Sequence, residues 1–200
     1  ESFYEKLHGP RTYGKPVMLY LRDLGVLSPR FSVAHGVWLT EAEIAAMAET
    51  GAAISHNPSS NLRLRAGIAP LNALLAAGVT TALGMDGTTI NEDEDMFAEM
   101  RLATRLHRTP RLHTPAPTPE QVFAMATSGG AKLMRQEGRL GRLAEGCTAD
   151  LSLVDITRAT WPWVSPEGDP RHLVLMRAAA GDVNTVFVGG TVALRDGLPT

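Results

Sequence analysis

The sequence predicts a parallel α/β fold followed by a small β unit. Three short apolar runs are typical of buried strands, and helix signals fall between them. The runs are Phe31–Ala34, Ala52–Ser55 and Thr80–Met85. Strands that alternate with helices form a parallel sheet with right-handed crossovers. Such a sheet is either doubly wound or a closed barrel, and both architectures place their chemistry at the carboxyl ends of the strands.

Local capping signals mark where the intervening helices begin and end. Thr40 and Glu43 have the spacing of a capping box, and we expect the helix that they start to end at Gly51. Pro70 opens a second helix, which Gly78 ends. Further helices are expected at residues 16–24, 93–107 and 118–126.

After about residue 138 the sequence changes to turn-rich segments and short strands. The expected strands are Ala149–Asp155, Val183–Val188 and Thr191–Leu194, the last two as a hairpin. Between them we expect a Pro-rich loop at Trp161-Pro162-Trp163. We therefore predict two units, residues 1–137 and residues 138–200.

Composition and charge narrow the classes of function. The 200 residues are 44% hydrophobic and 20% charged, as in ordinary globular proteins. The net charge is −2, whereas nucleic-acid-binding proteins usually carry an excess of basic residues. We therefore expect a small-molecule substrate and no nucleic-acid partner. No apolar stretch approaches the roughly 20 residues that span a bilayer, so no membrane partner is expected. The single cysteine, Cys147, excludes an internal disulfide and suits a reducing compartment, so we expect a cytoplasmic protein.

Three polar residues stand where the predicted strands end: His35, His56 and Asp86. Taken one at a time, each has an ordinary structural explanation. Asp86 precedes a glycine in a common turn pair, His56 begins a turn-like segment, and His35 could be a hydrogen-bonded core residue. Because the carboxyl ends of parallel strands meet on one face of a sheet, the three together form a candidate site.

Six segments around these positions carry a recognisable pattern: residues 34–39, 56–64, 67–70, 82–87, 125–131 and 141–151. In their order and spacing, these segments resemble the amidohydrolase superfamily. They resemble most the branch that holds cytosine and guanine deaminases, S-adenosylhomocysteine and methylthioadenosine deaminases, and triazine hydrolases. The resemblance implies that this chain is the C-terminal part of a (β/α)8 TIM-type barrel, strands six to eight, with a small C-terminal β-sandwich segment.

The resemblance also implies roles for individual residues. Asp86 corresponds to an aspartate that binds the metal and takes a proton from the attacking water. His35 corresponds to a histidine that hydrogen-bonds the water or substrate. Glu1 corresponds to the proton-shuttling glutamate of a His-x-x-Glu motif, although a terminal glutamate is usually just solvated. The residues expected to line the substrate site are Trp38, His56 and Asn61, and for Trp38 aromatic packing over the barrel mouth is an equal alternative.

Several family features are missing from this sequence. The His-x-His pair of the first strand, the histidine of His-x-x-Glu and strands one to five are all absent. The expected cofactor is one divalent metal ion, zinc first and iron as the alternative, with most of its ligands outside this chain. We therefore expect the N-terminal half of the barrel to come from the same polypeptide or from a partner chain. A homo-oligomer is compatible with the resemblance.

The function expected from the resemblance is metal-dependent hydrolytic deamination of a nitrogen heterocycle, such as a purine, pyrimidine or pterin ring. The alternative within enzymes is a triazine-type hydrolase that displaces chloride or an alkylamine. From a different class comes a non-catalytic scaffold that kept the fold and lost its metal. The presence of Glu1, His35 and Asp86 together argues against a scaffold, which has no need of them.

Overall fold

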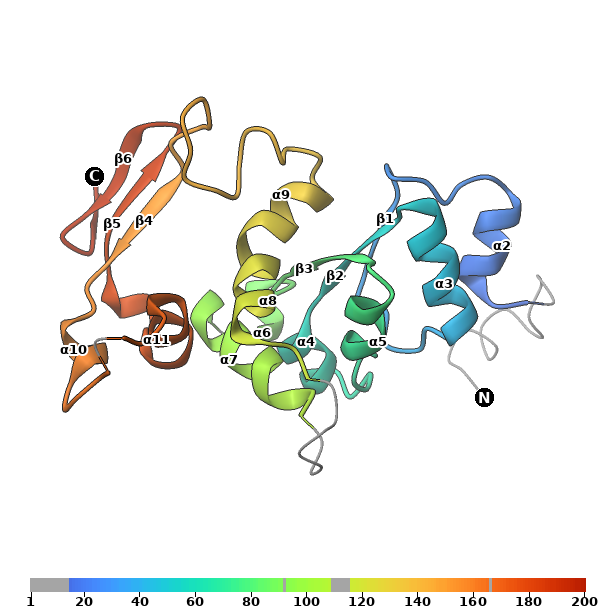
Figure 1. The fold of residues 1–200 in the computed structure, drawn as a ribbon, viewed down its shortest axis with the longest axis horizontal. Coiled ribbons are helices and arrows are strands. Elements are labelled where there is room, and N and C mark those ends of the chain that lie inside the picture. Colours follow the sequence, from blue (N-terminus) through green and yellow to red (C-terminus); the bar gives the residue numbers. More distant parts are fainter. Residues whose placement is uncertain (1–14, 92, 109–115, 166) are drawn as a thin grey trace.

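The computed structural model describes residues 15–91, 93–108, 116–165 and 167–200. Figure 1 shows a central parallel sheet with helices around it, and a second sheet formed by the C-terminal part of the chain. The parallel sheet has the order β1-β2-β3, and the second sheet is antiparallel with the order β4-β5-β6-β7. Among the described helices, none has both the length and the apolar character needed to cross a membrane.

The parallel sheet consists of β1 (Ser32–Ala34), β2 (Ala53–His56) and β3 (Thr80–Leu83). All three predicted strands are present, with ends that differ from the prediction by one or two residues. Val33 of β1 pairs with Ile54 of β2, and both neighbouring pairs of strands run parallel. The carboxyl ends of the three strands therefore lie at one edge of the sheet.

On one side of this sheet, the helices bury the first of two apolar clusters. These helices are α2 (Val17–Asp23), α3 (Glu41–Thr50) and α5 (Leu71–Ala76). The predicted capping box of α3 is present: the Thr40 hydroxyl accepts from the Glu43 N–H, and the Glu43 carboxylate accepts from the Thr40 N–H. The cluster contains Leu27, Ile44, Ala46, Met47, Ala52, Ile54, Leu74 and Val79.

The second group of helices follows β3. It consists of α6 (Thr88–Asn91), α7 (Met96–Leu106), α8 (Pro119–Ala124), the π-helical turn η1 (Met125–Gly129) and α9 (Gly130–Leu133). Thr118 and Gln121 form the second predicted capping box, but the helix continues well past its predicted end at residue 126. In this continuation η1 packs directly on β3, where a Cβ added at Gly129 would lie 2.5 Å from the Thr81 carbonyl oxygen.

Two helices were not predicted: the first lies where the sequence suggested a turn, and the second lies in a segment to which no element was assigned. They are α4 (Pro58–Arg63), directly after β2, and α11 (Pro170–Arg177), which follows the short α10 (Thr157–Thr160). Each carries proline in its first turn, where the missing N–H costs no hydrogen bond. Leu175 of α11 is fully buried in the second apolar cluster. That cluster contains Leu71, Leu83, Met100, Ala103, Val122, Met125 and Leu175.

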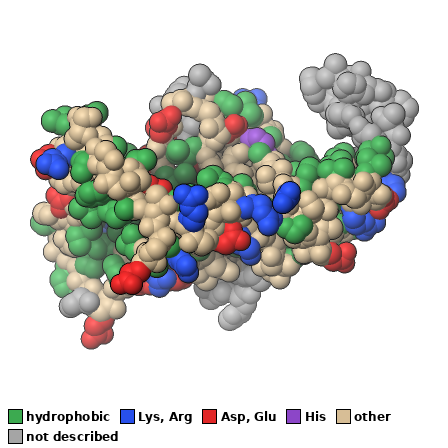
Figure 2. Space-filling model, turned by 90° about the horizontal axis from the view of Figure 1, so that it is seen from above, with side chains coloured by type: hydrophobic (Ala, Val, Ile, Leu, Met, Phe, Trp, Pro, Cys, Tyr) green, Lys and Arg blue, Asp and Glu red, His purple; other side chains and the backbone are tan. Residues whose placement is uncertain are grey.

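The antiparallel sheet contains the predicted hairpin. Its strands are β4 (Leu151–Val154), β5 (Val183–Val188), β6 (Thr191–Arg195) and β7 (Leu198–Pro199), and the turn η2 (Ala180–Asp182) leads into β5. Figure 2 shows hydrophobic side chains on the surface at this end of the molecule, and Leu153, Val188 and Leu198 of these strands are exposed. The helix α11 packs on α7 and α8, which belong to the predicted first unit. The division of the chain into two units at residue 138 stays a prediction.

Candidate functional site

His35 and Asp86 lie together at the carboxyl edge of the parallel sheet. His35 directly follows β1, and Asp86 follows the end of β3 by three residues. The Nε2 atom of His35 lies 3.8 Å from Oδ2 of Asp86. The two side chains are 38% and 32% exposed, so a small molecule or an ion can reach both of them.

The backbone holds both residues in an uncommon conformation. His35 has a φ of 70° and Asp86 a φ of 67°, which places both in the left-handed region. Residues other than glycine occupy this region at a cost of roughly 1–2 kcal/mol. Strained backbone of this kind persists where the surroundings hold it, and it is concentrated at functional sites.

Two consecutive residues of α4 bind these two side chains. The Ser60 hydroxyl donates a hydrogen bond of 2.7 Å to Oδ2 of Asp86. The Asn61 Oδ1 atom lies 2.9 Å from Nδ1 of His35 and accepts the proton of that ring nitrogen. Ser60 and Asn61 are 0% and 2% exposed, so these contacts are made from inside the protein.

The turn between β3 and Asp86 packs tightly against the end of β2. The Gly84 N–H donates to the carbonyl oxygen of His56. A Cβ at Gly84 would lie 2.5 Å from Oδ1 of Asn57 and 2.7 Å from the Ser55 hydroxyl. Any other residue at position 84 would therefore force the Asn57 and Ser55 side chains, or the turn itself, to shift.

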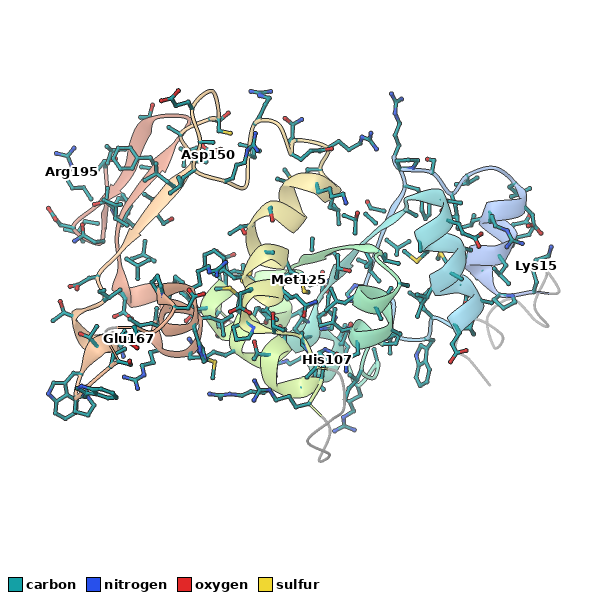
Figure 3. The ribbon with its side chains drawn as sticks, viewed as in Figure 1. Lys15, His107, Met125, Asp150, Glu167 and Arg195 are labelled. Carbon is teal, nitrogen blue, oxygen red and sulfur yellow. The ribbon has the colours of Figure 1, made fainter. Side chains whose placement is uncertain are left out.

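His56 contacts the residue at the end of α7. Its Nε2 atom lies 3.0 Å from Nε2 of His107, the residue that follows α7 and is labelled in Figure 3. Burial lowers the pKa of His56 to about 3, aided by the neighbouring ring, and burial also lowers the pKa of His107 to about 4. Both rings are therefore neutral at pH 7, and one donates to the other.

The remaining predicted site residues differ in their surroundings. Trp38 is 83% exposed, and the nearest carbon of its ring lies 3.5 Å from the position that a Cβ atom added at Gly67 would occupy. Glu1 lies outside the residues that the structure describes.

The sequence did not indicate Ser60 and His107 as neighbours of predicted site residues, or Glu99 as a neighbour of α4. Glu99 of α7 is 2% exposed, and its Oε2 atom accepts from the Ser59 N–H at 3.4 Å. These three residues lie far along the chain from the groups that they contact, so no local pattern could have identified them. The Pro58 signal for a helix start could have pointed to α4.

The side chains of Asp86 and His35 fit part of a metal site. Carboxylate oxygen and imidazole nitrogen are both ligands that zinc accepts, and a catalytic zinc is held by three protein ligands. Within the described residues, no group of three or more His, Cys, Asp or Glu side chains could hold a metal ion. Further ligands are therefore needed to complete a site at this edge of the sheet.

Comparisons with known proteins identify relatives over almost the whole chain. The chain is 38% identical over 198 residues to a 5-methylthioadenosine/S-adenosylhomocysteine deaminase of Nitratidesulfovibrio vulgaris, covering 98% of this chain and 44% of that protein. It thus spans less than half the length of this curated relative.

Solved structures show the same partial coverage. An adenosine deaminase from Xanthomonas campestris with bound zinc superimposes with a TM-score of 0.89 at 32% identity, over 100% of this chain and 45% of that one. An atrazine chlorohydrolase from Arthrobacter aurescens, complexed with zinc, gives a TM-score of 0.83 at 28% identity, over 98% of this chain and 42% of that one. The model of the amidohydrolase family matches residues 8–193, and the chain therefore belongs to the amidohydrolase family.

Proposed function

We propose that the polypeptide that carries this chain catalyses the metal-dependent hydrolytic deamination of a nitrogen heterocycle. The observation that carries the proposal is the 3.8 Å approach of His35 to Asp86, each held by a hydrogen bond from α4. The names of the relatives favour a ring of the adenine type, as in adenosine or 5-methylthioadenosine.

The two side chains have complementary tasks in such a reaction. A divalent metal ion at Asp86, zinc by analogy with the relatives, would lower the pKa of a water molecule and make it nucleophilic. Asp86 accepts the proton of this water as the oxygen adds to the ring carbon, and then passes it to the departing amine, which leaves as ammonia. His35 donates its Nδ1 proton to Asn61, so its Nε2 atom presents a lone pair that orients the attacking water.

The rest of the active site belongs to the proposal as well. We propose that β1, β2 and β3 are strands six to eight of a TIM-type barrel, and that residues 138–200 contribute to a small β-sandwich. The N-terminal half of the barrel would supply the missing metal ligands. Glu1 would protonate the ring nitrogen, and Trp38 would cover the substrate.

Replacement of Asp86 by asparagine tests the proposal. Asp86→Asn removes the proton acceptor and a metal ligand, so we expect ammonia release from adenine nucleosides to fall by at least about 1,000-fold. The matched control is Asp196→Asn, because Asp196 is also an aspartate with a positive φ, 52°, but it follows β6 in the distant antiparallel sheet. If Asp86→Asn kept a turnover close to that of the wild type, Asp86 would not be the metal ligand and proton acceptor of the reaction.

The similarity to the atrazine chlorohydrolase favours a second candidate, displacement of chloride or an alkylamine from a triazine ring. Parallel assays of ammonia and chloride release separate the two reactions. A purified protein that holds no stoichiometric metal and is inactive on both classes of ring would instead support a non-catalytic scaffold.

A further inference from the structure

We propose that α4 is the positioning element of the site, with Ser60 fixing Asp86 and Asn61 fixing His35. This inference rests on the proposed function and names two residues that position the groups assigned to the reaction. Neither residue is assigned a contact with the reacting atoms.

The first argument is the geometry of the two hydrogen bonds. Ser60 and Asn61 are adjacent, and successive residues of a helix point about 100° apart, so one turn of α4 reaches two groups that leave different strands. Both partners lie 26 residues from their α4 residue along the chain. One short helix thus connects the end of β1 with the end of β3.

The second argument is that the site needs such support. His35 and Asp86 both have a positive φ, and neither lies within a strand or helix. A side chain on a loop is positioned less accurately than one on a helix or strand, unless further hydrogen bonds hold it. The bonds from Ser60 and Asn61 supply that restraint from fully buried positions.

The third argument is that α4 is itself held in place. Its N-cap residue, Asn57, makes no side-chain capping bond. The buried carboxylate of Glu99 on α7 accepts from the Ser59 N–H instead, and a negative charge is favourable at a helix N-terminus. The position of α4 is therefore tied to the position of α7.

The contact with Asn61 also selects one tautomer of His35. A neutral imidazole carries one N–H, and the group bonded to one nitrogen decides which nitrogen holds it. With Nδ1–H donated to Asn61, Nε2 is left as the acceptor that faces Asp86. Loss of the Asn61 acceptor would free the proton to move to Nε2.

Ser60→Ala and Ser59→Ala form a matched pair that tests the Asp86 half of the proposal. The two serines are neighbours in α4, but the Ser59 hydroxyl is buried without a hydrogen-bond partner among the residues that the structure describes. We expect Ser60→Ala to lower kcat by about 10–100-fold with KM changed less than about twofold, because supporting residues of metal sites have effects of this size. In the cobalt(II)-loaded protein, Ser60→Ala should also shift the visible absorption band, whereas Ser59→Ala should leave both readouts unchanged.

Equal effects of the two alanine variants would overturn the role of Ser60. A loss of thermal stability in Ser60→Ala without a change in kcat or in the cobalt band would overturn it as well, since that is the result of a purely structural hydroxyl.

The His35 half of the proposal is tested without metal or substrate. Nitrogen-15 NMR of the histidine-labelled, metal-free protein at ~pH 8.5, well above the ordinary histidine pKa, reports which ring nitrogen carries the proton. We expect the Nδ1–H tautomer in the wild type and in Asn61→Asp, and the Nε2–H tautomer in Asn61→Leu. An Nε2–H tautomer in the wild type would overturn the proposal.

These readouts also separate the inference from the proposed function. If no heterocycle is deaminated but His35 changes tautomer in Asn61→Leu, the proposed function fails and positioning by Asn61 stands. If the wild type is active and the tautomer is the same in all variants, the positioning proposal fails alone.

Discussion

At the scale of single residues, His35 and Asp86 have backbone angles that histidine and aspartate tolerate better than most residue types. Their positions at strand ends could be predicted, because strand ends follow from the local apolar pattern. The hydrogen bonds from Ser60 and Asn61 could not, since they join residues 26 positions apart. The carboxylate of Glu99 under α4 was unpredictable for the same reason.

The positive φ of His35 leads to a prediction about stability. His35→Gly and His35→Ala both remove the imidazole, but only glycine adopts a φ of 70° without a steric cost. We expect His35→Gly to be more stable than His35→Ala by about 1 kcal/mol, measured by urea denaturation. Equal stability of the two variants would contradict the left-handed conformation at this position.

The buried pair His56 and His107 predicts a pH dependence of stability. Their pKa values in the folded protein are about 3 and about 4, below the ordinary value of 6.5. Below pH 6.5 the unfolded chain therefore binds more protons than the folded chain. The free energy of unfolding should therefore fall as the pH drops from 6.5 toward 4, by up to about 1.4 kcal/mol per pH unit for each histidine. Below the folded-state pKa values the loss is complete.

Urea denaturation between pH 4.5 and pH 6.5 measures this slope, because this range lies between the folded-state and the ordinary pKa values of both histidines. We expect His107→Gln to reduce the slope by about half, because one of the two shifted groups is removed. His172→Gln, at an exposed histidine on α11, should leave it unchanged. A slope that His107→Gln does not alter would exclude the buried pair as its cause.

At the scale of elements, the sequence predicted those segments whose boundaries carry local signals. The capping boxes at Thr40 and Thr118 formed as expected, and so did the three parallel strands and the hairpin. The helix α4 was missed because Asn57-Pro58 was interpreted as a turn signal, although proline in the first turn also starts helices. No element was predicted for the segment that forms α11, which begins with Pro170 in the same way.

The π-helical turn η1 gives a prediction at two adjacent glycines. Gly129 and Gly130 both have helical φ values, −64° and −60°, so helix propensity alone favours alanine at both. A Cβ at Gly129 would lie 2.5 Å from a backbone oxygen of β3, whereas a Cβ at Gly130 would have no neighbour within 4 Å.

We therefore expect opposite effects of the two alanine substitutions on the melting temperature. Gly129→Ala should destabilise the protein by about 1–3 kcal/mol, because neither backbone can retreat. Gly130→Ala should stabilise it by up to about 1 kcal/mol. The same change in melting temperature for both variants would contradict the close packing of η1 on β3.

At the scale of the whole molecule, the described parallel sheet is an incomplete layer. Its order is β1-β2-β3, so the outer edges of β1 and β3 have no strand beside them in the part of the chain that the structure describes. Unpaired edges of this kind are sites where further strands can add. The family membership could be predicted from the motifs around the strand ends. These motifs do not show which strands would pair with the outer edges of β1 and β3.

The candidate metal site is incomplete in the same way, and we expect this to weaken metal binding. With two candidate ligands among the described residues, we expect the 200-residue chain alone to retain well below one equivalent of zinc after dialysis. A polypeptide in which the barrel is completed should retain about one equivalent, measured by elemental analysis. If the chain alone retained one equivalent of zinc, it would have to contain metal ligands in addition to Asp86 and His35.

The burial of Leu175 has a consequence for engineering. This leucine of α11 fills space between α7 and α8, and the Asp95 carboxylate accepts from the Ala180 N–H just beyond it. Truncation after residue 137 would therefore leave a leucine-sized hole in the core, at a cost of about 2–5 kcal/mol.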